Sequence, residues 1–198
     1  MLLLHTPRVK LSKQELRLKA KHAVQSMSFG NVQRLSEPIR EKIEQLPEFV
    51  SSDTIASYVA TKEEVQTQQI IRDALNEGKR ILVPKVVSRK ELLFSEIKDM
   101  TDLEVRGFGL LEPKLDLIHE VPLREAKVII VPLVAWDERG YRIGHGKGYF
   151  DRALANLSEN LKVGLAFEAQ RVDRVPEEEH DIPLDVVITE ERIVRLKR

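Results

Sequence analysis

A glycine-rich run at residues 140–152 carries the residue types that a phosphate-binding site requires. Four of the protein's nine glycines lie in this run, and Arg142, His145, Lys147 and Asp151 are set among them. Glycine has no Cβ, so it lets the backbone approach a ligand closely and adopt the positive φ angles of a phosphate-binding loop. Backbone N–H groups, two cations and a carboxylate suit a nucleotide bound with a divalent metal. We therefore predict a phosphate site here.

Common nucleotide motifs do not describe this run. A Walker A loop needs Ser or Thr after its lysine, but Gly148 follows Lys147. The dinucleotide fingerprint Gly-x-Gly-x-x-Gly does not match Gly144, Gly146 and Gly148, which are separated by one residue each time. The structural alternative is a glycine-rich hairpin or helix-entry loop with solvated charges, and the loop alone does not decide between the two.

A basic pair near the N-terminus is a second candidate. Ser12 and Glu15 form a capping-box pattern, which predicts a helix over residues 13–27. Lys13 opposes the helix dipole in the first turn, and Arg17 shares its face at i+4. These cations are either part of a solvated basic face or an anion clamp at the helix N-terminus.

Two acidic positions complete the set of candidates. Glu63 and Glu64 follow an apolar run at residues 54–60, where they either begin a helix or reach the N–H groups of a ligand. Asp181 follows His180 in an acidic loop, and such charges are usually solvated. Asp151 and a carboxylate of this loop could instead share a Mg²⁺ ion. The spacing of His145 and His180 does not support a histidine metal site.

The elements that must position these residues alternate between helices and strands, and several strands are continuous apolar runs. This pattern favours an α/β fold: an open, largely parallel sheet with helices on both faces, in three α/β/α layers and one domain over residues 1–198. Because ligands bind at the carboxyl ends of strands in such sheets, the glycine run follows its strand in the expected place. The expected helices cover residues 13–27, 32–46, 70–78 and 151–157, and the expected strands cover 54–60, 80–86, 92–97, 128–136, 161–167, 185–189 and 192–196, with 98–122 irregular.

Composition narrows the function classes. Apolar residues make up 42 % of the chain, which allows a substantial core, and 32 Lys plus Arg balance 32 Asp plus Glu. Neutrality argues against a dedicated nucleic-acid or membrane-surface protein. The chain has no cysteine, which excludes disulfides, a thiol nucleophile and a zinc–thiolate site. The apolar run at residues 1–5 is too short for a signal peptide, and we expect a cytoplasmic protein.

Together these segments resemble the 5-formyltetrahydrofolate cyclo-ligase family over nearly the whole chain. The glycine run is the strongest match, and the Lys13–Arg17 pair, residues 58–64, 164–167 and 180–190 accompany it in order. Phe150 stands where many members carry a second tyrosine, which leaves the role of that hydroxyl open. The resemblance implies an enzyme that uses ATP and Mg²⁺ to convert 5-formyltetrahydrofolate, with one or several glutamates, into 5,10-methenyltetrahydrofolate, releasing ADP and phosphate. It implies phosphoryl activation of the formyl oxygen and ring closure by N10.

The resemblance also implies roles for particular residues. Lys147 and Arg142 are the expected catalytic cations, and Asp151 and Asp181 match the magnesium positions. The expected ATP-binding residues are Lys13, Arg17, Arg142, Ile143, Gly144, His145, Gly146, Lys147, Gly148, Tyr149 and Phe150. The expected folate-binding residues are Arg17, Glu64, His145, Gly146, Lys147, Gly148 and Tyr149. We expect a monomer that binds neither nucleic acid nor membrane.

Two other functions remain as alternatives. One is a non-catalytic relative that serves as an RNA-associated or regulatory binding module, although both cations, the glycine run and both acidic positions are retained. The other is an ATP-dependent phosphotransferase with a similar loop and a different small substrate.

Overall fold

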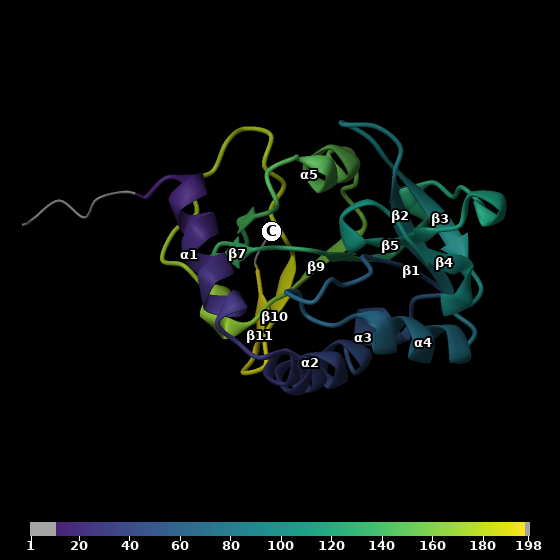
Figure 1. The fold of residues 1–198 in the computed structure, drawn as a ribbon, viewed down its shortest axis with the longest axis horizontal. Helices are drawn as coiled ribbons and strands as arrows, with labels where there is room; N and C mark the ends of the chain where they lie inside the picture. Colours follow the sequence, from purple (N-terminus) through teal and green to yellow (C-terminus); the bar gives the residue numbers. More distant parts are fainter. Residues whose placement is uncertain (1–10, 197–198) are drawn as a thin grey trace, which may run out of the picture.

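The computed structural model describes residues 11–196 and is built on one seven-stranded sheet (Figure 1). The strand order is β11-β10-β9-β6-β1-β2-β3; the five inner strands are parallel, and β3 and β11 are antiparallel edges. The bounds are β1 (Thr54–Ser57), β2 (Arg80–Val86), β3 (Leu92–Ile97), β6 (Val128–Val131), β9 (Leu161–Leu165), β10 (Val186–Ile188) and β11 (Ile193–Arg195).

Helices cover both faces of the sheet, so the expected three-layer α/β/α fold is confirmed (Figure 1). One face packs against α2 (Phe29–Glu44), α3 (Pro47–Val50) and α4 (Gln68–Asn76), and the other packs against α5 (Tyr149–Leu154). Side chains alternate between the two cores, because successive residues of a strand point to opposite faces. On β1, for example, Ile55 belongs to the first core and Ala56 to the second.

The first helix, α1 (Lys13–Gln25), lies beside the sheet rather than on it (Figure 1). Its capping box is formed: the Ser12 hydroxyl accepts from the Glu15 N–H, and the Glu15 carboxylate accepts from the Ser12 N–H. Leu16 and Ala20 pack into a small cluster, separate from the two main cores, together with Val134, Ala135, Ile143 and Val175. The helix ends two residues before the expected Met27.

The expected strand at residues 128–136 is wrong in its length, because it is two strands. After β6, Pro132 has no N–H with which to continue the ladder, and the chain leaves the main sheet. The next strand, β7 (Ala135–Trp136), pairs antiparallel with β8 (Arg142–Ile143). The glycine run therefore follows a separate two-stranded hairpin, and not the sheet strand itself.

Residues 98–122, expected to be irregular, contain a short hairpin of β4 (Leu103–Val105) and β5 (Leu111–Pro113) beside β2. One-turn 3₁₀ helices make up several of the remaining connections, at Met100–Asp102, Gly107–Gly109, Leu115–Leu117, Leu123–Glu125 and Glu168–Gln170. Among residues 11–196, no helix is both long and apolar enough to cross a bilayer.

Candidate active site

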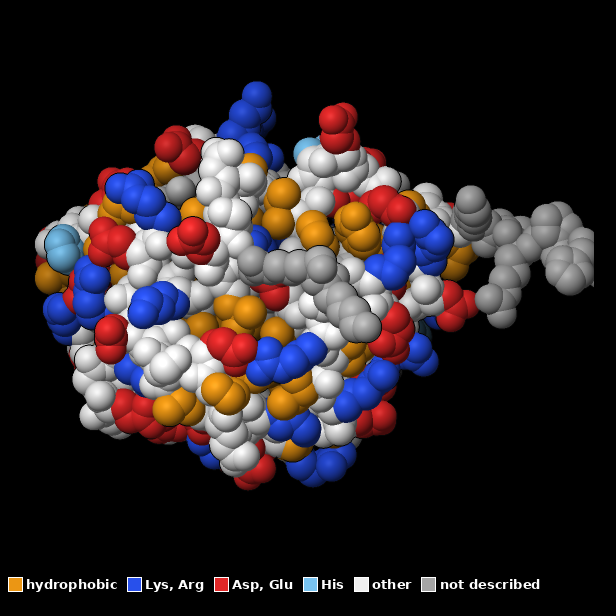
Figure 2. All heavy atoms as spheres, turned by 180° about the vertical axis from the view of Figure 1, so that it is seen from behind, with side chains coloured by type: hydrophobic (Ala, Val, Ile, Leu, Met, Phe, Trp, Pro, Cys, Tyr) orange, Lys and Arg blue, Asp and Glu red, His pale blue; other side chains and the backbone are white. Residues whose placement is uncertain are grey.

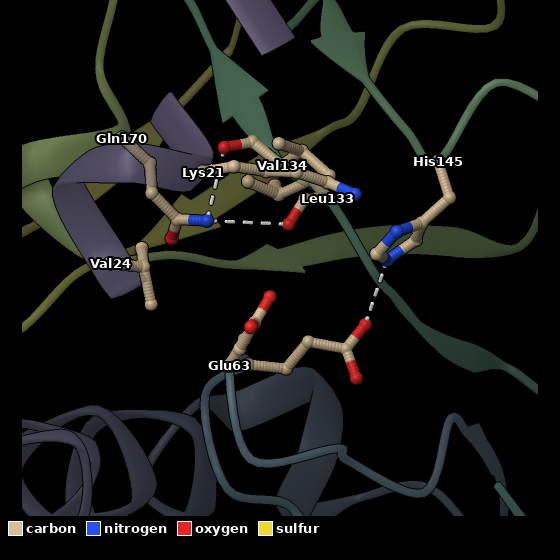
Figure 3. Close-up of a pocket in the computed structure, with 8 residues that line it drawn as sticks. Lys21, Val24, Glu63, Leu133, Val134, His145 and Gln170 are labelled. Carbon is tan, nitrogen blue, oxygen red and sulfur yellow. Dashed lines mark hydrogen bonds and ion pairs between the residues drawn. The ribbon is translucent and has the colours of Figure 1, made fainter. Parts of the chain in front are cut away.

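The candidate site lies where the strand order of the sheet reverses. From β1 the chain adds β2 on one side, and from β6 it adds β9 and β10 on the other, so the reversal falls between β1 and β6. In open α/β sheets ligands bind outside the carboxyl ends of the strands at this point. A small cavity of about 20 Å³ lies there. Its lining comes from α1, from the loops after β1, β6 and β9, and from the glycine loop: Lys21, Val24, Glu63, Glu64, Leu133, Val134, His145 and Gln170 (Figure 3).

Glu64 and His145 close one side of this cavity. Glu64 Oε1 lies 3.1 Å from His145 Nε2, which Figure 3 marks with a dashed line. The N–H and hydroxyl of Thr61 donate to Glu64 Oε2 at 2.8 and 2.9 Å. Burial acts to raise the pKa of the Glu64 carboxyl, but these hydrogen bonds outweigh it and hold the pKa below its usual value. The carboxylate is therefore ionised and presented to N–H donors.

The basic pair of α1 reaches two different parts of the site. Arg17 Nε donates to the carbonyl oxygen of Gly144 at 2.8 Å, which docks the helix on the glycine loop. Lys13 Nζ lies 2.6 Å from Asp181 Oδ2 and 3.3 Å from Glu178 Oε2. The two cations thus join α1 to segments more than a hundred residues away in sequence, and neither belongs only to a solvated face.

Arg142 is a buried cation held by two groups. Its guanidinium is 3 % exposed; one nitrogen lies 2.7 Å from Asp151 Oδ1, and the other donates to the carbonyl oxygen of Ile182 at 2.5 Å. Burial lowers the pKa of this guanidinium, while the nearby Asp151 and Asp181 carboxylates act in the opposite direction. Arg142 thereby links the start of α5 to the loop that carries Asp181.

The two carboxylates predicted as magnesium ligands lie on either side of this link. Asp151 accepts hydrogen bonds from Arg142 and from the Ile182 N–H through Oδ1. Asp181 accepts from Lys13 and from the Glu178 N–H through Oδ2. Each therefore has a second oxygen of the kind that Mg²⁺ prefers. Glu178, His180 and Asp181 also bring their ligand atoms within 4.8 Å of one another. This donor set, dominated by carboxylate oxygens, fits a hard divalent cation.

The far end of the glycine loop packs on the β2–β3 hairpin. The Tyr149 hydroxyl donates to the carbonyl oxygen of Ser88 at 2.9 Å, and Arg152 Nε donates to that of Lys90 at 2.7 Å. Arg152 also donates to the carbonyl oxygen of Lys147 at 2.9 Å, and both cations lie over the Tyr149 ring. The sequence analysis assigned no role to Arg152, although Arg152 is the last residue of the glycine-rich run at residues 140–152.

Two predicted nucleotide contacts face the protein interior. Ile143 is buried against α1, and the Phe150 ring packs edge-to-face on Phe94 with centroids 6.2 Å apart. The Ile143 side chain is buried, so any contact of this residue with a ligand would have to come from its backbone, whereas Phe150 is partly buried. Gly146 and Gly148 have φ angles of 94° and 63°, which side-chain-bearing residues rarely adopt. The loop conformation therefore requires glycine at both positions.

Asp137 is a site-supporting residue that the sequence did not reveal. Its side chain is fully buried and accepts from the N–H groups of Arg139, Tyr141 and Val175 at 2.9 to 3.2 Å and from the Arg139 guanidinium. These bonds fix the turn between β7 and β8, from which the glycine loop leaves. The sequence did contain a signal for a turn here, because Asp137 directly follows an apolar run and Gly140 comes three residues later.

Comparisons with known proteins identify relatives over most of this chain. The model of the 5-formyltetrahydrofolate cyclo-ligase family matches residues 9–190. The 5-formyltetrahydrofolate cyclo-ligase of Escherichia coli K12 is 34 % identical over 165 residues, which cover 81 % of this chain and 91 % of that protein. A probable 5-formyltetrahydrofolate cyclo-ligase of Caenorhabditis elegans is 34 % identical over 92 % of this chain and 94 % of its own length.

Solved structures give the same result. The structure of Aquifex aeolicus 5,10-methenyltetrahydrofolate synthetase superposes with a TM-score of 0.82 at 36 % identity, covering 94 % of this chain and 93 % of that one. The synthetase of Mycoplasma pneumoniae superposes with a TM-score of 0.74 at 25 % identity, covering 91 % and 99 %. The match to the family model includes α1, the glycine loop and every strand of the main sheet except β11, so this chain belongs to the 5-formyltetrahydrofolate cyclo-ligase family.

Proposed function

We propose that this enzyme uses ATP and Mg²⁺ to convert 5-formyltetrahydrofolate into 5,10-methenyltetrahydrofolate, with release of ADP and phosphate. One observation carries the proposal beyond family membership: α1, the acidic loop after β1 and the acidic loop before β10 all converge on the glycine loop at the reversal of strand order. This arrangement supplies a phosphate-binding backbone, several cations and a carboxylate for N–H groups within one site.

The chemistry explains why such a site is needed. A formamide oxygen is a poor leaving group, so ring closure requires its activation. The formyl oxygen attacks the γ-phosphorus of ATP, the bond from that phosphorus to the bridging oxygen of ADP breaks, and the N5 lone pair gives an iminium phosphate. N10 then attacks the formyl carbon and loses its proton, and the C–O bond breaks to release phosphate as the five-membered ring closes. The protein's task is to align these atoms, neutralise charge and exclude water.

The residues divide into two groups in this proposal. Lys147 is the cation that contacts the transferring phosphoryl group, and Gly144, Gly146 and Gly148 present N–H groups to the phosphates. Glu64, ionised and already accepting N–H donors, receives the polar N–H groups of the pterin in place of His145. Lys13 and Arg17 hold α1 against the nucleotide.

Arg142, predicted as a second catalytic cation, receives a positioning role. Because its guanidinium is buried on Asp151 and Ile182, it orients the carboxylates and does not reach the substrate. Asp151 and Asp181 would hold the Mg²⁺ ion, which neutralises charge on the phosphate oxygens of ATP.

Ligand binding requires the site to open. A cavity of about 20 Å³ has room for about one water molecule, and a pterin is several times larger. The Glu64–His145 contact and the Gln25–Glu63 hydrogen bond, at 3.1 Å, join the two walls and must give way first. The substrate therefore competes with contacts inside the protein.

The test is a turnover assay on the purified protein. We expect ATP consumption only when Mg²⁺ and 5-formyltetrahydrofolate are both present, together with the near-ultraviolet absorbance of the methenyl product. ATP hydrolysis that is indifferent to folate would support the phosphotransferase alternative, and no turnover at all would support a binding module. Either result would refute the proposal.

Lys147→Ala should abolish turnover and leave the melting temperature close to that of the parent. Lys127→Ala is the matched control, because Lys127 is exposed at the amino end of β6, on the opposite edge of the sheet. Similar losses of activity in both variants, or a large loss of melting temperature in Lys147→Ala alone, would contradict a catalytic role for Lys147. The monomeric state and the cytoplasmic location stay predictions, which size-exclusion chromatography and cell fractionation would test.

A further inference from the structure

Arg152 joins the glycine loop to the β2–β3 hairpin through a single guanidinium group. Its Nε donates to the carbonyl oxygen of Lys90 in the hairpin turn at 2.7 Å, and its Nη2 donates to that of Lys147 in the loop at 2.9 Å. The Tyr149 hydroxyl reaches the same turn and donates to the carbonyl oxygen of Ser88 at 2.9 Å. The loop is therefore tied to the hairpin at its carboxyl end.

A solvated surface cation is the alternative reading of Arg152. The residue is exposed, and Figure 2 shows Lys and Arg side chains projecting from the upper edge of the molecule, where the tip of the hairpin lies. Its guanidinium is nevertheless held on several sides. It lies over the Tyr149 ring, 5.5 Å from the centroid, and a Cβ added at Gly148 would come within 2.9 Å of its Nη1. The group thus occupies the space that a side chain at position 148 would need.

The bond to the Lys147 carbonyl fixes the peptide group that follows it. All peptide bonds of residues 11–196 are trans, so the carbonyl of Lys147 and the N–H of Gly148 point in opposite directions. Because the carbonyl points to Arg152, the Gly148 N–H is turned away from Arg152 and from the hairpin. Within the described part of the chain, this N–H donates to no other protein group. It is therefore held ready for an acceptor outside the protein.

Arg17 makes the same kind of contact at the other end of the loop. Its Nε donates to the carbonyl oxygen of Gly144 at 2.8 Å, and this turns the N–H of His145 away from α1. The His145 N–H also has no partner within residues 11–196. Two arginines from opposite sides thus each hold one carbonyl of the loop and orient the next N–H group.

We infer that Arg152 is a positioning residue for phosphoryl transfer. It holds the Lys147–Gly148 peptide so that the Gly148 N–H and the Lys147 side chain meet the phosphates of ATP, and this inference rests on the proposed function. Donors that are fixed before the reaction need no reorganisation as charge develops on the phosphoryl oxygens. The role suits arginine, because its planar group offers N–H donors in fixed directions to two carbonyls at once, which a lysine cannot do.

The kinetic test compares Arg152→Ala and Arg152→Lys with the parent. We expect Arg152→Ala to lower kcat by on the order of tenfold and to raise KM for ATP, because the phosphate donors lose their alignment. KM for 5-formyltetrahydrofolate should stay within about twofold of the parent. Arg152→Lys keeps the charge without the planar group, so its kcat should stay within about threefold of that of Arg152→Ala.

Lys79→Ala is the matched control for the loss of two carbonyl contacts. Lys79 donates to the carbonyl oxygens of Val50 at 2.8 Å and Ser52 at 3.1 Å and lies over the Phe49 ring, but it precedes β2 at the amino end of the sheet. Its removal should lower the melting temperature at least as much as Arg152→Ala does and leave kcat at the parent value. Parental kcat in Arg152→Lys, or an equal fall of kcat in Lys79→Ala, would overturn the inference.

A binding measurement keeps this test independent of turnover. The probes are AMP-PNP, a non-hydrolysable analogue of ATP, with Mg²⁺, and adenosine, which has no phosphates. By calorimetry, Arg152→Ala should weaken AMP-PNP binding by on the order of tenfold and leave adenosine binding unchanged. Weaker AMP-PNP binding in a protein whose parent does not turn over 5-formyltetrahydrofolate would refute the proposed function but retain the role of Arg152 at the phosphates. Equal AMP-PNP binding by parent and variant would refute that role whatever the turnover.

Discussion

The buried pair of Arg142 and Asp151 offers the sharpest test of how the site is held together. The structure gives the pair a 2.7 Å contact, with the arginine side chain 3 % and the aspartate side chain 24 % exposed. Arg142→Met removes the charge at similar volume, Asp151→Asn removes the opposite charge, and the double variant removes both. A double-mutant cycle then isolates the energy of the pair from the other contacts of each residue.

The expected energy of the Arg142–Asp151 pair follows from how deeply the two side chains are buried. Breaking a fully buried pair costs about 3–5 kcal/mol, because the remaining charge stays buried without its partner. We expect each single substitution to cost about 3 kcal/mol, near the lower limit, because Asp151 keeps about a quarter of its side chain in solvent and Arg142 keeps the Ile182 carbonyl. The coupling energy of the pair should then be about 2 kcal/mol. The free energy of unfolding of each variant is measured by urea denaturation and extrapolated to zero denaturant.

The matched control is the pair of Arg195 and Glu48, which has contacts of 2.7 and 3.0 Å but side chains 50 % and 37 % exposed. Its coupling energy should stay below about 1 kcal/mol, because water screens an exposed pair. A coupling for Arg142 and Asp151 no larger than that of this control would refute the view that burial makes the first pair a structural link. Arg142 would then be assigned a direct contact with the substrate instead.

Three further changes probe the site from other directions. Because the pKa of Glu64 is held below its usual value, its ionised form contributes stability at neutral pH, and this stability is lost as pH falls through the folded-state pKa. Glu64→Gln should therefore reduce the loss of unfolding free energy at acid pH, measured by urea denaturation between about pH 3 and 7. A variant with the pH dependence of the parent would contradict the lowered pKa. Gly146→Ala should lower the free energy of unfolding by about 1–3 kcal/mol and raise KM for ATP, because a φ of 94° is strained for alanine and the added Cβ would lie 3.4 Å from the Arg17 guanidinium. A variant with the stability of the parent would show that the loop adopts another conformation. Asp137→Asn leaves part of a buried hydrogen-bond set unsatisfied and should lower the free energy of unfolding, measured by urea denaturation, by about 1–3 kcal/mol. A smaller loss of stability than that of a surface substitution such as Lys127→Ala would contradict the role of Asp137 in the β7–β8 turn.

The sequence predicted the elements well where local patterns decide the structure. The strands at residues 80–86 and 92–97 occur at the expected residues, because each is a short apolar run next to turn-forming residues. The first helix begins at Lys13, where the capping box placed it. Pro132 was a signal for the end of the strand β6, since proline has no N–H to donate to a neighbouring strand, but the continuous apolar run over residues 128–136 suggested a single strand.

The contacts that build the site were less accessible from the sequence. The residue types and their spacing indicate which residues take part in the site, but they do not indicate that Arg142 points inwards to Asp151 or that Arg17 donates to a backbone carbonyl. Such contacts depend on how segments far apart in the chain pack, and no local pattern records that packing. The contacts of Arg152 were missed for the same reason, because only the folded hairpin brings the Lys90 carbonyl beside the glycine loop.

The position of α1 beside the sheet has a consequence for how the enzyme loses and regains its site. This helix rests on its own small cluster and on the Lys13–Asp181 and Arg17–Gly144 contacts, and only its last turn, through Val24, reaches a main core. It can therefore detach while the sheet stays folded, so its amide hydrogens should exchange faster than those of β1 and β6. Ligands that bind only the assembled site draw on the free energy of this docking step. A ligand that binds only the assembled site should therefore slow the hydrogen exchange of α1.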